Sequence, residues 1–319
     1  MKQLYWHYRY IINELKYARD LVFDRLSKKG RQGKPKIRYI RFGNMEPDYN
    51  QAICLFCSYD KSCTVSRNVY YYLNALKQAG FNIIFISSSD SISDDDLKKL
   101  ASYCIQIINR ENRGYDFYSW KVALQQYPQY PMHKALLLAN DSVLGPLFSI
   151  GDIIDKLEEN TADIVSMTDS LQFHPHLQSY FLYCKKTVST SLEFADFFNQ
   201  VEELRFKMAI VRAYEIGFSR SLSRHFKLSA LYNLEASLNH IQYAEKPRNW
   251  IDLTHDLWKP LITDFKFPYL KKRLVVKRDL SIEEIIAALT EANADYNNDL
   301  LSDFKKQPPQ TTSAKNLTK

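Results

Sequence analysis

Glycine is scarce in this sequence of 319 residues, which has 8 glycines against 22 tyrosines and 18 phenylalanines. No G-x-G-x-x-G follows the first predicted strand and no G-x-x-x-x-G-K-[ST] occurs anywhere, which argues against a dinucleotide-dependent enzyme and a P-loop NTPase. The G-x-S-x-G turn of one class of serine hydrolases is missing, and so is the H-E-x-x-H spacing of zinc peptidases. These absences remove the commonest short motifs for phosphate binding and hydrolysis.

Long hydrophobic runs and paired cysteines are missing as well. No apolar stretch approaches the roughly 18 to 20 residues of a membrane-spanning helix, and the N-terminus has no apolar core of a secretory signal. Among the 5 cysteines, Cys54 and Cys57 form a C-x-x-C, but on a predicted strand these two side chains point to opposite faces. Such a pair suits neither a zinc site nor a redox centre. We therefore predict buried, reduced thiols in a cytoplasmic protein.

Positive charge is gathered in two places, although the net charge is only +7. The stretch 28–38 is basic without one acidic residue, and a second cluster lies at 271–273. Residues 4–27 alternate apolar and basic residues at helical spacing, which is typical of an amphipathic helix. Residues 1–40 are thus predicted to lie on an anionic membrane surface at the inner face of the cell membrane, or to pack on the main domain or a partner. Nucleic-acid binding is not expected, because the aromatic residues are not interleaved with Lys and Arg.

Strands and helices alternate from residue 52 onward, which is typical of a mostly parallel α/β sheet flanked by helices. Strands are predicted at 52–58, 81–87, 104–108, 134–139, 163–167, 176–185 and 228–232. Helices are predicted at 66–79, 93–103, 115–127, 149–159, 190–206, 208–226 and 281–292. Residues 30–35 have the composition of a linker, 247–276 are predicted to be irregular, and 307–319 to be disordered. The predicted domains are a basic helix with a linker (1–45), one α/β domain (46–285), and a helix end with a tail (286–319).

The stretch from Asn109 to Pro146 organises the chain. A polar turn containing Gly114 opens a helix, and the apolar run that follows ends abruptly at 140–142, in Asn-Asp-Ser. Ligands of open α/β sheets bind beyond the carboxyl ends of the strands, so Asp141 lies where a carboxylate would meet a ligand or a metal. The alternative is a polar turn in which Asp141 only caps the next segment. The layout matches glycosyltransferases of the GT-A type, in which such an acid holds a divalent cation against the diphosphate of a nucleotide sugar.

Several motifs make this resemblance specific. They are N-R-G-Y-D-F-Y-S-W at 112–120, L-L-L-A-N-D-S-V-L-G-P at 136–146, H-L-Q-S-Y-F-L at 176–182, Y-E-I-G at 214–217, T-H-D-L-W-K-P-L-I at 254–262 and P-Y-L-K-K at 268–272. In this order they resemble the rhamnan synthesis protein F family of bacterial polysaccharide glycosyltransferases. The resemblance implies a GT-A-like fold, a nucleotide-sugar donor (dTDP-rhamnose in several members), a glycan or lipid-linked acceptor, and Mg²⁺ or Mn²⁺. Here the D-x-D of GT-A enzymes is reduced to the single carboxylate of Asp141.

The resemblance also implies roles on the donor side. Asp141 is the predicted metal ligand and His255 a further one, although His255 can equally be a loop histidine that bonds locally. The residues predicted to shape the nucleotide-sugar pocket or hold its loop are Asn112, Gly114, Asp116, Asn140 and Ser142. The alternative for Asp116 is a helix cap, and turn chemistry alone would explain Asn140 and Ser142.

On the acceptor side, Glu215 is the predicted general base, because the acceptor hydroxyl must lose its proton as the glycosidic bond forms. A solvated glutamate on an amphipathic helix is the alternative. The predicted acceptor-side residues are His176, Gln178 and Ser179, although a strand with one polar face would give the same alternation. The pair at 271–272, Lys271 and Lys272, either clamps the diphosphate or belongs to a solvated surface.

Two readings of the function follow. A base at Glu215 favours an inverting transferase that works by single displacement. The single carboxylate at 140–142 keeps open a catalytically weak subunit that binds a nucleotide sugar or glycan within a polysaccharide biosynthesis complex.

Overall fold

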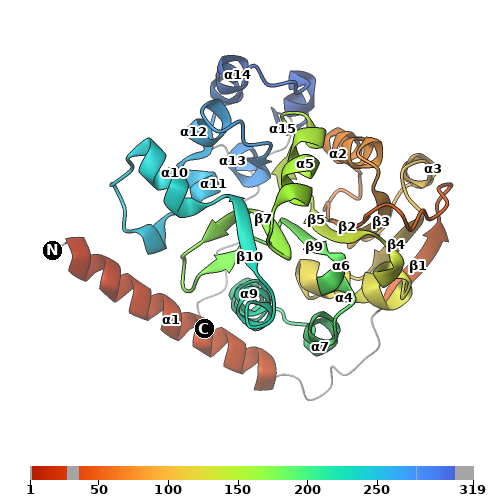
Figure 1. Cartoon of the computed structure of the whole chain (residues 1–319), viewed down its shortest axis with the longest axis horizontal. Helices are drawn as coiled ribbons and strands as arrows, with labels where there is room; N and C mark the ends of the chain where they lie inside the picture. Colours follow the sequence, from red (N-terminus) through yellow and green to blue (C-terminus); the bar gives the residue numbers. More distant parts are fainter. Residues whose placement is uncertain (1, 27–35, 278, 306–319) are drawn as a thin grey trace, which may run out of the picture.

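A nine-stranded sheet lies at the centre of the molecule (Figure 1). The structure is a computed structural model that describes residues 2–26, 36–277 and 279–305. Four neighbouring strands are parallel, in the order β4-β3-β2-β5. Their bounds are Ile53–Ser58 (β2), Asn82–Ser87 (β3), Gln106–Arg110 (β4) and Ala135–Asn140 (β5). The mostly parallel α/β sheet predicted from the sequence is confirmed.

The other strands complete the sheet on both sides. β9 (Phe181–Lys185) lies antiparallel between β5 and β7 (Ile164–Ser170), and β10 (Leu228–Tyr232) runs parallel to β7. β8 (His176–Leu177) pairs with β7, so the strand predicted at 176–185 is broken at 178–180. A separate two-stranded sheet joins β6 (Val143–Leu144) to β11 (Leu270–Lys271).

Helices cover both faces of the sheet (Figure 1). One face packs against α2 (Arg67–Gln78), α5 (Ile150–Glu159) and α10 (Leu234–Ile241). The opposite face packs against α4 (Tyr115–Gln126), α7 (Leu192–Gln200) and α9 (Gly217–Leu222). Burial on both faces explains why the parallel strands are continuous apolar runs. The C-x-x-C shows the same geometry, because Cys54 belongs to the first of these cores and Cys57 to the second, and both thiols are free.

The remaining helices are shorter or peripheral. They are α1 (Lys2–Leu26), α3 (Asp94–Ala101), η1 (Tyr130–Met132), α6 (Lys186–Ser189), α8 (Lys207–Ile210), η2 (Val211–Ile216), η3 (Arg248–Trp250), α11 (Leu253–Asp256), α12 (Trp258–Thr263), α13 (Lys272–Val276), α14 (Ile282–Glu291), η4 (Asn298–Leu301) and α15 (Ser302–Lys305). Two helices begin at serine caps: the Ser66 side chain accepts the backbone N–H of Val69 at the start of α2, and Ser93 accepts that of Asp96 at the start of α3. Ser149 precedes α5, where a serine cap was also predicted, but its side chain makes no capping hydrogen bond.

Three expectations need correction. The helix predicted at 190–206 ends at Gln200, because the backbone N–H groups of Arg205 and Phe206 bind the Asp24 carboxylate instead of helix carbonyls. Residues 247–276 are not irregular but contain η3, α11, α12, β11 and α13, with Pro260 in the first turn of α12, where no helical hydrogen bond is lost. The sheet also starts within the predicted 1–45 segment, since β1 (Ile37–Phe42) pairs antiparallel with β4.

The ends of the α/β domain also differ in detail from the predicted boundaries. α14 spans the boundary predicted at 285, and its Ile285 and Leu289 pack in one cluster with Leu144 and Leu270 of the small sheet. The predicted linker at 30–35 and disordered tail at 307–319 lie outside the described residues.

Candidate active site

The candidate site lies where the order of the parallel strands reverses. The chain runs from β2 outward to β3 and β4, and then returns to place β5 on the other side of β2. Ser58 and Asp141 stand at the carboxyl ends of these two neighbours, and Ser58 Oγ donates to Asp141 Oδ2 over 3.0 Å. The backbone N–H of Tyr59 points at the same oxygen from 3.4 Å. Ligands of open α/β sheets bind at such a switch point.

Asn140 connects Asp141 to the helix that precedes β5. Its amide Nδ2 donates to Asp116 Oδ2 over 2.9 Å, and its Oδ1 accepts the backbone N–H of Ser142 over 3.1 Å. Burial, together with the charges of Asp141 and Glu215, raises the pKa of Asp116 to about 7. Asp116 is therefore part of a cluster of carboxylates that repel one another.

Lys271 and Lys272 belong to this cluster and not to a solvated surface. β11 pairs with β6, and the backbone N–H of Lys272 donates to the Ser142 carbonyl over 3.0 Å. Lys272 Nζ lies 3.6 Å from Asp141 Oδ2, and Lys271 Nζ stands 3.8 Å above the centre of the Tyr180 ring. Burial lowers the pKa of Lys271 to about 8. The pairing of β6 with β11 brings both lysines close to Asp141, and their binding to a diphosphate stays a prediction.

Glu215 faces the same cluster from the helix formed by α8, η2 and α9. One oxygen, Oε1, accepts both the backbone N–H and the hydroxyl of Ser179, each over 2.8 Å. The Glu215 charge helps to raise the pKa of Asp116, and it opposes the burial that lowers the pKa of Lys271. Glu215 lies in η2, a π-helical segment, and such segments are often found at functional sites.

A pocket of about 510 Å³ opens beside these residues. It is lined by Tyr59, Ser88, Asn112, Arg113, Gly114, Tyr115, Asp116, Glu203, Leu204 and Arg205. Gly114 has φ +72°, and a Cβ there would lie 2.7 Å from Tyr118 Cβ, so the turn requires glycine. The predicted pocket residues Asn112, Gly114 and Asp116 do line one hollow.

Two pocket residues that were not among the predicted site residues are Tyr59 and Tyr115, although Tyr115 lies within the motif at 112–120. Their side chains are 46% and 48% exposed in the pocket wall, which leaves their rings accessible to a planar ligand. Tyr115 also has a positive φ of 53°, which a non-glycine residue adopts only when its surroundings enforce it. Tyr59 follows β2 directly, so its position at the end of a predicted strand could have marked it as a candidate pocket residue. No local signal marks residues 203–205.

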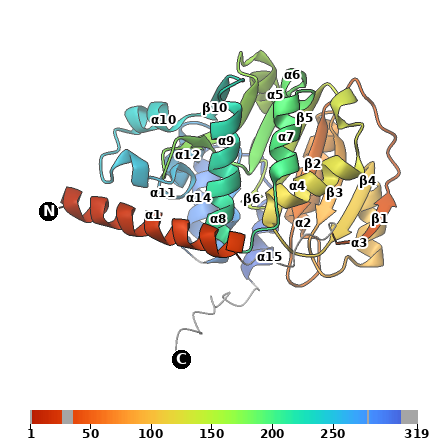
Figure 2. The same cartoon turned by 90° about the horizontal axis from the view of Figure 1, so that it is seen from below.

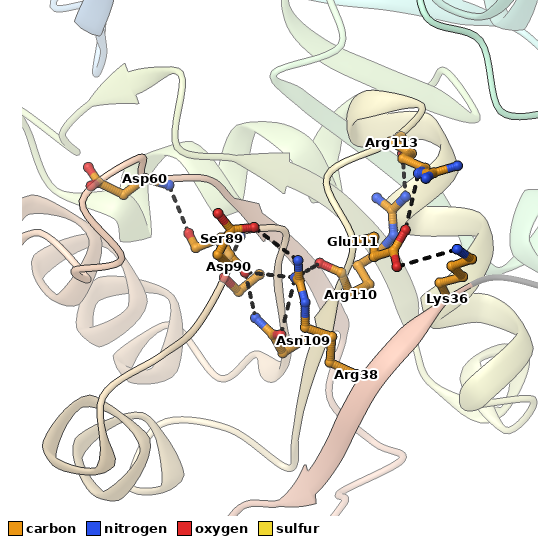
Figure 3. Close-up of polar contacts among 10 residues, drawn as sticks. Lys36, Arg38, Asp60, Ser89, Asp90, Asn109, Arg110, Glu111 and Arg113 are labelled. Carbon is orange, nitrogen blue, oxygen red and sulfur yellow. Dashed lines mark hydrogen bonds and ion pairs between the residues drawn. The ribbon is translucent and has the colours of Figure 1, made fainter.

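Arg38 of β1 braces the loops around this pocket (Figure 3). Its guanidinium donates to the Ser89 carbonyl over 3.0 Å, to the Arg110 carbonyl over 2.6 Å and to Asp90 Oδ1 over 3.0 Å. The Ser89 hydroxyl in turn accepts the backbone N–H of Asp60 over 2.9 Å. Arg38 thus connects the ends of β3 and β4, and the Ser89 hydroxyl extends the connection to the end of β2.

A second set of ion pairs reaches across the pocket mouth. Arg113 pairs with Glu111 at 3.1 Å, and Glu111 also faces Lys36 at 3.7 Å (Figure 3). Arg113 NH1 lies 3.4 Å from Glu203 on the opposite wall. The loop after β4 is therefore joined to residues 203–205.

Other predicted residues lie elsewhere. His176 lines a separate hollow of about 540 Å³, where its Nδ1 is 2.7 Å from the His174 carbonyl. Gln178 Oε1 accepts the hydroxyl of Thr168 over 2.6 Å. Of the three residues predicted for the acceptor side, only Ser179 contacts Glu215.

The donor set at Asp141 fits an ammonium group better than a divalent cation. Asp141 Oδ2 is surrounded by a hydroxyl, a backbone N–H and Lys272, whereas Mg²⁺ requires several oxygen ligands. Burial lowers the pKa of His255, and the charges of Lys271 and Arg273 add to the shift. Among residues 2–26, 36–277 and 279–305, no group of three or more His, Cys, Asp or Glu side chains is arranged to hold a metal ion.

An α/β sheet with polar residues and a pocket at its switch point defines a class of ligand-binding α/β proteins. Within that class, residues 83–311 match the family model described as rhamnan synthesis protein F, and the chain belongs to this family. Membership connects the chain with polysaccharide synthesis, and it confirms the resemblance found in the sequence motifs.

Two curated relatives are similar to this chain. The virulence protein VirA of Vibrio anguillarum is 24% identical over 330 residues, which cover 91% of this chain and 99% of that protein. The uncharacterized protein y4gN of Sinorhizobium fredii is 28% identical over 184 residues, which cover 56% of this chain and 48% of that protein. The match therefore spans about half the length of y4gN.

Solved structures of glycosyltransferases are among the distant likenesses. The apo structure of the bifunctional glycosyltransferase WbbM is 9% identical with a TM-score of 0.39, covering 81% of this chain and 52% of that one. The glycosyltransferase GlyE of Streptococcus pneumoniae TIGR4 is 10% identical with a TM-score of 0.38, covering 82% of this chain and 66% of that one.

Proposed function

We propose that the protein is an inverting glycosyltransferase that moves a sugar from a nucleotide donor to a growing cell-envelope glycan or lipid-linked oligosaccharide. The observation that carries the proposal is the gathering of Asp116, Asp141, Glu215 and Lys272 around the strand switch point beside a pocket of about 510 Å³. Rhamnose from dTDP-rhamnose is the proposed sugar, on the strength of the family.

The proposed donor occupies the pocket, with its base between the rings of Tyr59 and Tyr115 and its diphosphate toward Lys271 and Lys272. The acceptor hydroxyl attacks the anomeric carbon, and its proton passes to Glu215 as the bond to the diphosphate breaks. The nucleoside diphosphate leaves with both electrons of that bond, and the two ammonium groups stabilise its charge. A lipid-linked acceptor lies at a membrane, so contact of residues 1–40 with the inner face of the cell membrane belongs to the same proposal.

The predicted Mg²⁺ or Mn²⁺ ion is the part of the sequence-based hypothesis that the geometry supports least. Because Lys272 already pairs with Asp141, we expect donor binding to persist when divalent cations are removed. A metal held by Asp141 and His255 would instead make binding vanish with a chelator and with Asp141→Asn.

The test is isothermal titration of dTDP-rhamnose and other nucleotide sugars, with Mg²⁺, with Mn²⁺ and with a chelator. Lys272→Met is expected to weaken binding of the donor by about tenfold or more, the usual effect of removing one desolvated charge partner. Lys277→Met, a lysine beyond the site at the end of α13, is the matched control. Binding that requires metal would restore the Asp141–His255 hypothesis. Binding without any sugar transfer would favour the catalytically weak subunit, and no binding of any nucleotide sugar would contradict both.

A further inference from the structure

α1 is fixed to the domain by one of its faces. Tyr10 donates to the Phe173 carbonyl over 3.3 Å, and Glu14 pairs with Arg212 at 2.6 Å. At the other end of the helix, Asp24 accepts the backbone N–H groups of Arg205 and Phe206 over 3.0 and 3.1 Å. Figure 2 shows the C-terminal part of α1 passing beside α8, so its position is set by the fold.

The opposite face of α1 leaves large apolar side chains in solvent. Tyr8, Ile11, Leu15, Val22 and Leu26 recur at helical spacing, so they form one stripe. Leu15 is 66% exposed and Leu26 is 72% exposed. They stand out because most of the exposed large apolar residues in the described part of the chain are aromatic or isolated. A stripe of this kind marks an interaction surface.

Among the charged side chains of α1 that the structure describes, the basic ones are the more exposed. Arg9, Lys16 and Arg19 are exposed, and Arg19 pairs with the half-buried Asp20 at 2.8 Å. The other acidic side chains are half-buried at Glu14 and buried at Asp24, and both bond to the domain. Among the described side chains of α1, the outward face is therefore apolar and cationic. Two such faces would repel each other, so charge complementarity disfavours a second copy and favours an anionic surface.

We propose that the outward face of α1 docks flat on an anionic lipid surface, with the apolar stripe at the level of the acyl chains and the basic residues at the phosphates. A helix that lies in the interface has this combination of faces. Among the described residues, no helix has the length and apolar content to cross a bilayer, so the contact is with the surface. The inference deepens the membrane contact of the proposed function and rests on it.

The test is co-sedimentation of the full-length protein with vesicles, which needs neither donor nor acceptor. Phosphatidylcholine vesicles that contain phosphatidylglycerol are expected to bind the protein, and pure phosphatidylcholine much less. Raising the salt concentration should weaken the binding, because exposed charges are screened. A failed vesicle test combined with intact donor binding would overturn this inference and leave the transferase proposal standing.

Point variants locate the contact. Leu15→Asn combined with Val22→Asn is expected to reduce vesicle binding by about tenfold or more, since it removes two apolar contacts from the interface. Leu192→Asn on α7 is the control, because this leucine is 78% exposed on another helix and its loss should leave binding unchanged. Deleting residues 1–40 would also remove Arg38 and most of β1, so full-length variants are the sharper test.

The charge of the same face is tested by Lys16→Glu, which should weaken binding to anionic vesicles only. Lys98→Glu on α3 is its control. Equal binding to neutral vesicles, or salt-insensitive binding, would overturn the proposal that this face binds an anionic lipid surface. A concentration-dependent dimer that the Leu15 and Val22 changes abolish would show that the face serves a second copy of the chain.

Discussion

At the scale of the single residue, Glu215 is oriented by one neighbour. Both hydrogen bonds from Ser179 fall on Oε1, which fixes the carboxylate plane within a helix whose backbone is locally widened. A general base has to be held in this way before the acceptor arrives, because proton transfer requires a short and aligned contact.

We expect Glu215→Gln to lower the rate of sugar transfer by about 10²-fold or more while donor affinity stays within a factor of two to three, because the amide keeps the shape and loses the proton acceptor. Turnover and donor titration are measured on the same preparation. Glu193→Gln, a half-buried glutamate in the first turn of α7, is the matched control. Transfer at the wild-type rate would mean that Glu215 only supports the loop at Ser179.

Donor affinity should fall as the pH rises from 6 to 9. Asp116, with a pKa of about 7, gains a negative charge over this range, and Lys271, with a pKa of about 8, loses its positive charge. Both changes oppose an anionic diphosphate, and each is expected to cost about tenfold in affinity, the equivalent of one pKa unit.

Titration calorimetry at several pH values checks this dependence. Asp116→Asn should remove the part of the change near pH 7, and Lys271→Gln the part near pH 8. An affinity that is flat in wild type would contradict the placement of the diphosphate at this cluster.

The residues that the sequence located are those with a local signal. Asp141 follows an apolar run that stops abruptly, and Gly114 sits in a turn that only glycine can make. The residues at 203–205 have no such signal, because distant segments bring them to the pocket, and Tyr59 has only its position directly after β2. Lys271 and Lys272 were equally consistent with a solvated surface until the pairing of β11 with β6 placed them beside Asp141.

At the scale of the element, β1 does more than form one edge of the sheet. Arg38 reaches over β4 and satisfies carbonyls at the ends of β3 and β4. Edge strands with exposed basic residues also resist pairing with other chains, which fits the sequence of β1.

Replacing Arg38 by Met should lower the free energy of unfolding by about 1 to 3 kcal/mol, because two carbonyls lose a charged donor. It should weaken donor binding as well, since the loops at Ser89 and Arg110 line or support the pocket. Urea unfolding and donor titration measure the two effects. Arg41→Met, an exposed arginine on the same strand, is the control, and an Arg38 variant as stable as this control would contradict the role of a brace.

Elements with local start and stop signals were predictable, and those that depend on tertiary partners were not. α2 and α3 begin at serine caps that the sequence displays, and α2 is followed by Gly80 at φ +82°. The end of α7 depends on Asp24, which lies far away in sequence. β1 was not predicted, because its basic residues obscure the alternation of apolar and polar residues that is typical of a strand.

At the scale of the whole molecule, the C-terminal helices pack against the small sheet beside the site. Ile285, Leu289 and Leu301 pack in the same cluster as Leu144 and Leu270, so α14 and η4 stabilise the small sheet that carries Lys271. Arg67 of α2 closes this contact with a 2.6 Å ion pair to Asp303. Composition could predict a helix at 281–292, but not that it supports the residues next to Asp141.

The hydrogen bonds between Asp24 and residues 205–206 connect α1, the helix proposed to face lipid, directly to the pocket wall. Two ligands that bias the same element are coupled reciprocally. The factor by which a membrane raises the affinity for the donor therefore equals the factor by which the donor raises the affinity for the membrane. With α1 on a bilayer, a loaded protein is then expected to stay at the surface longer than an empty one. Release of the nucleoside diphosphate after transfer would then shorten the residence time of the protein on the membrane. Occupancy of the donor pocket would in this way set how long the protein stays bound to the bilayer.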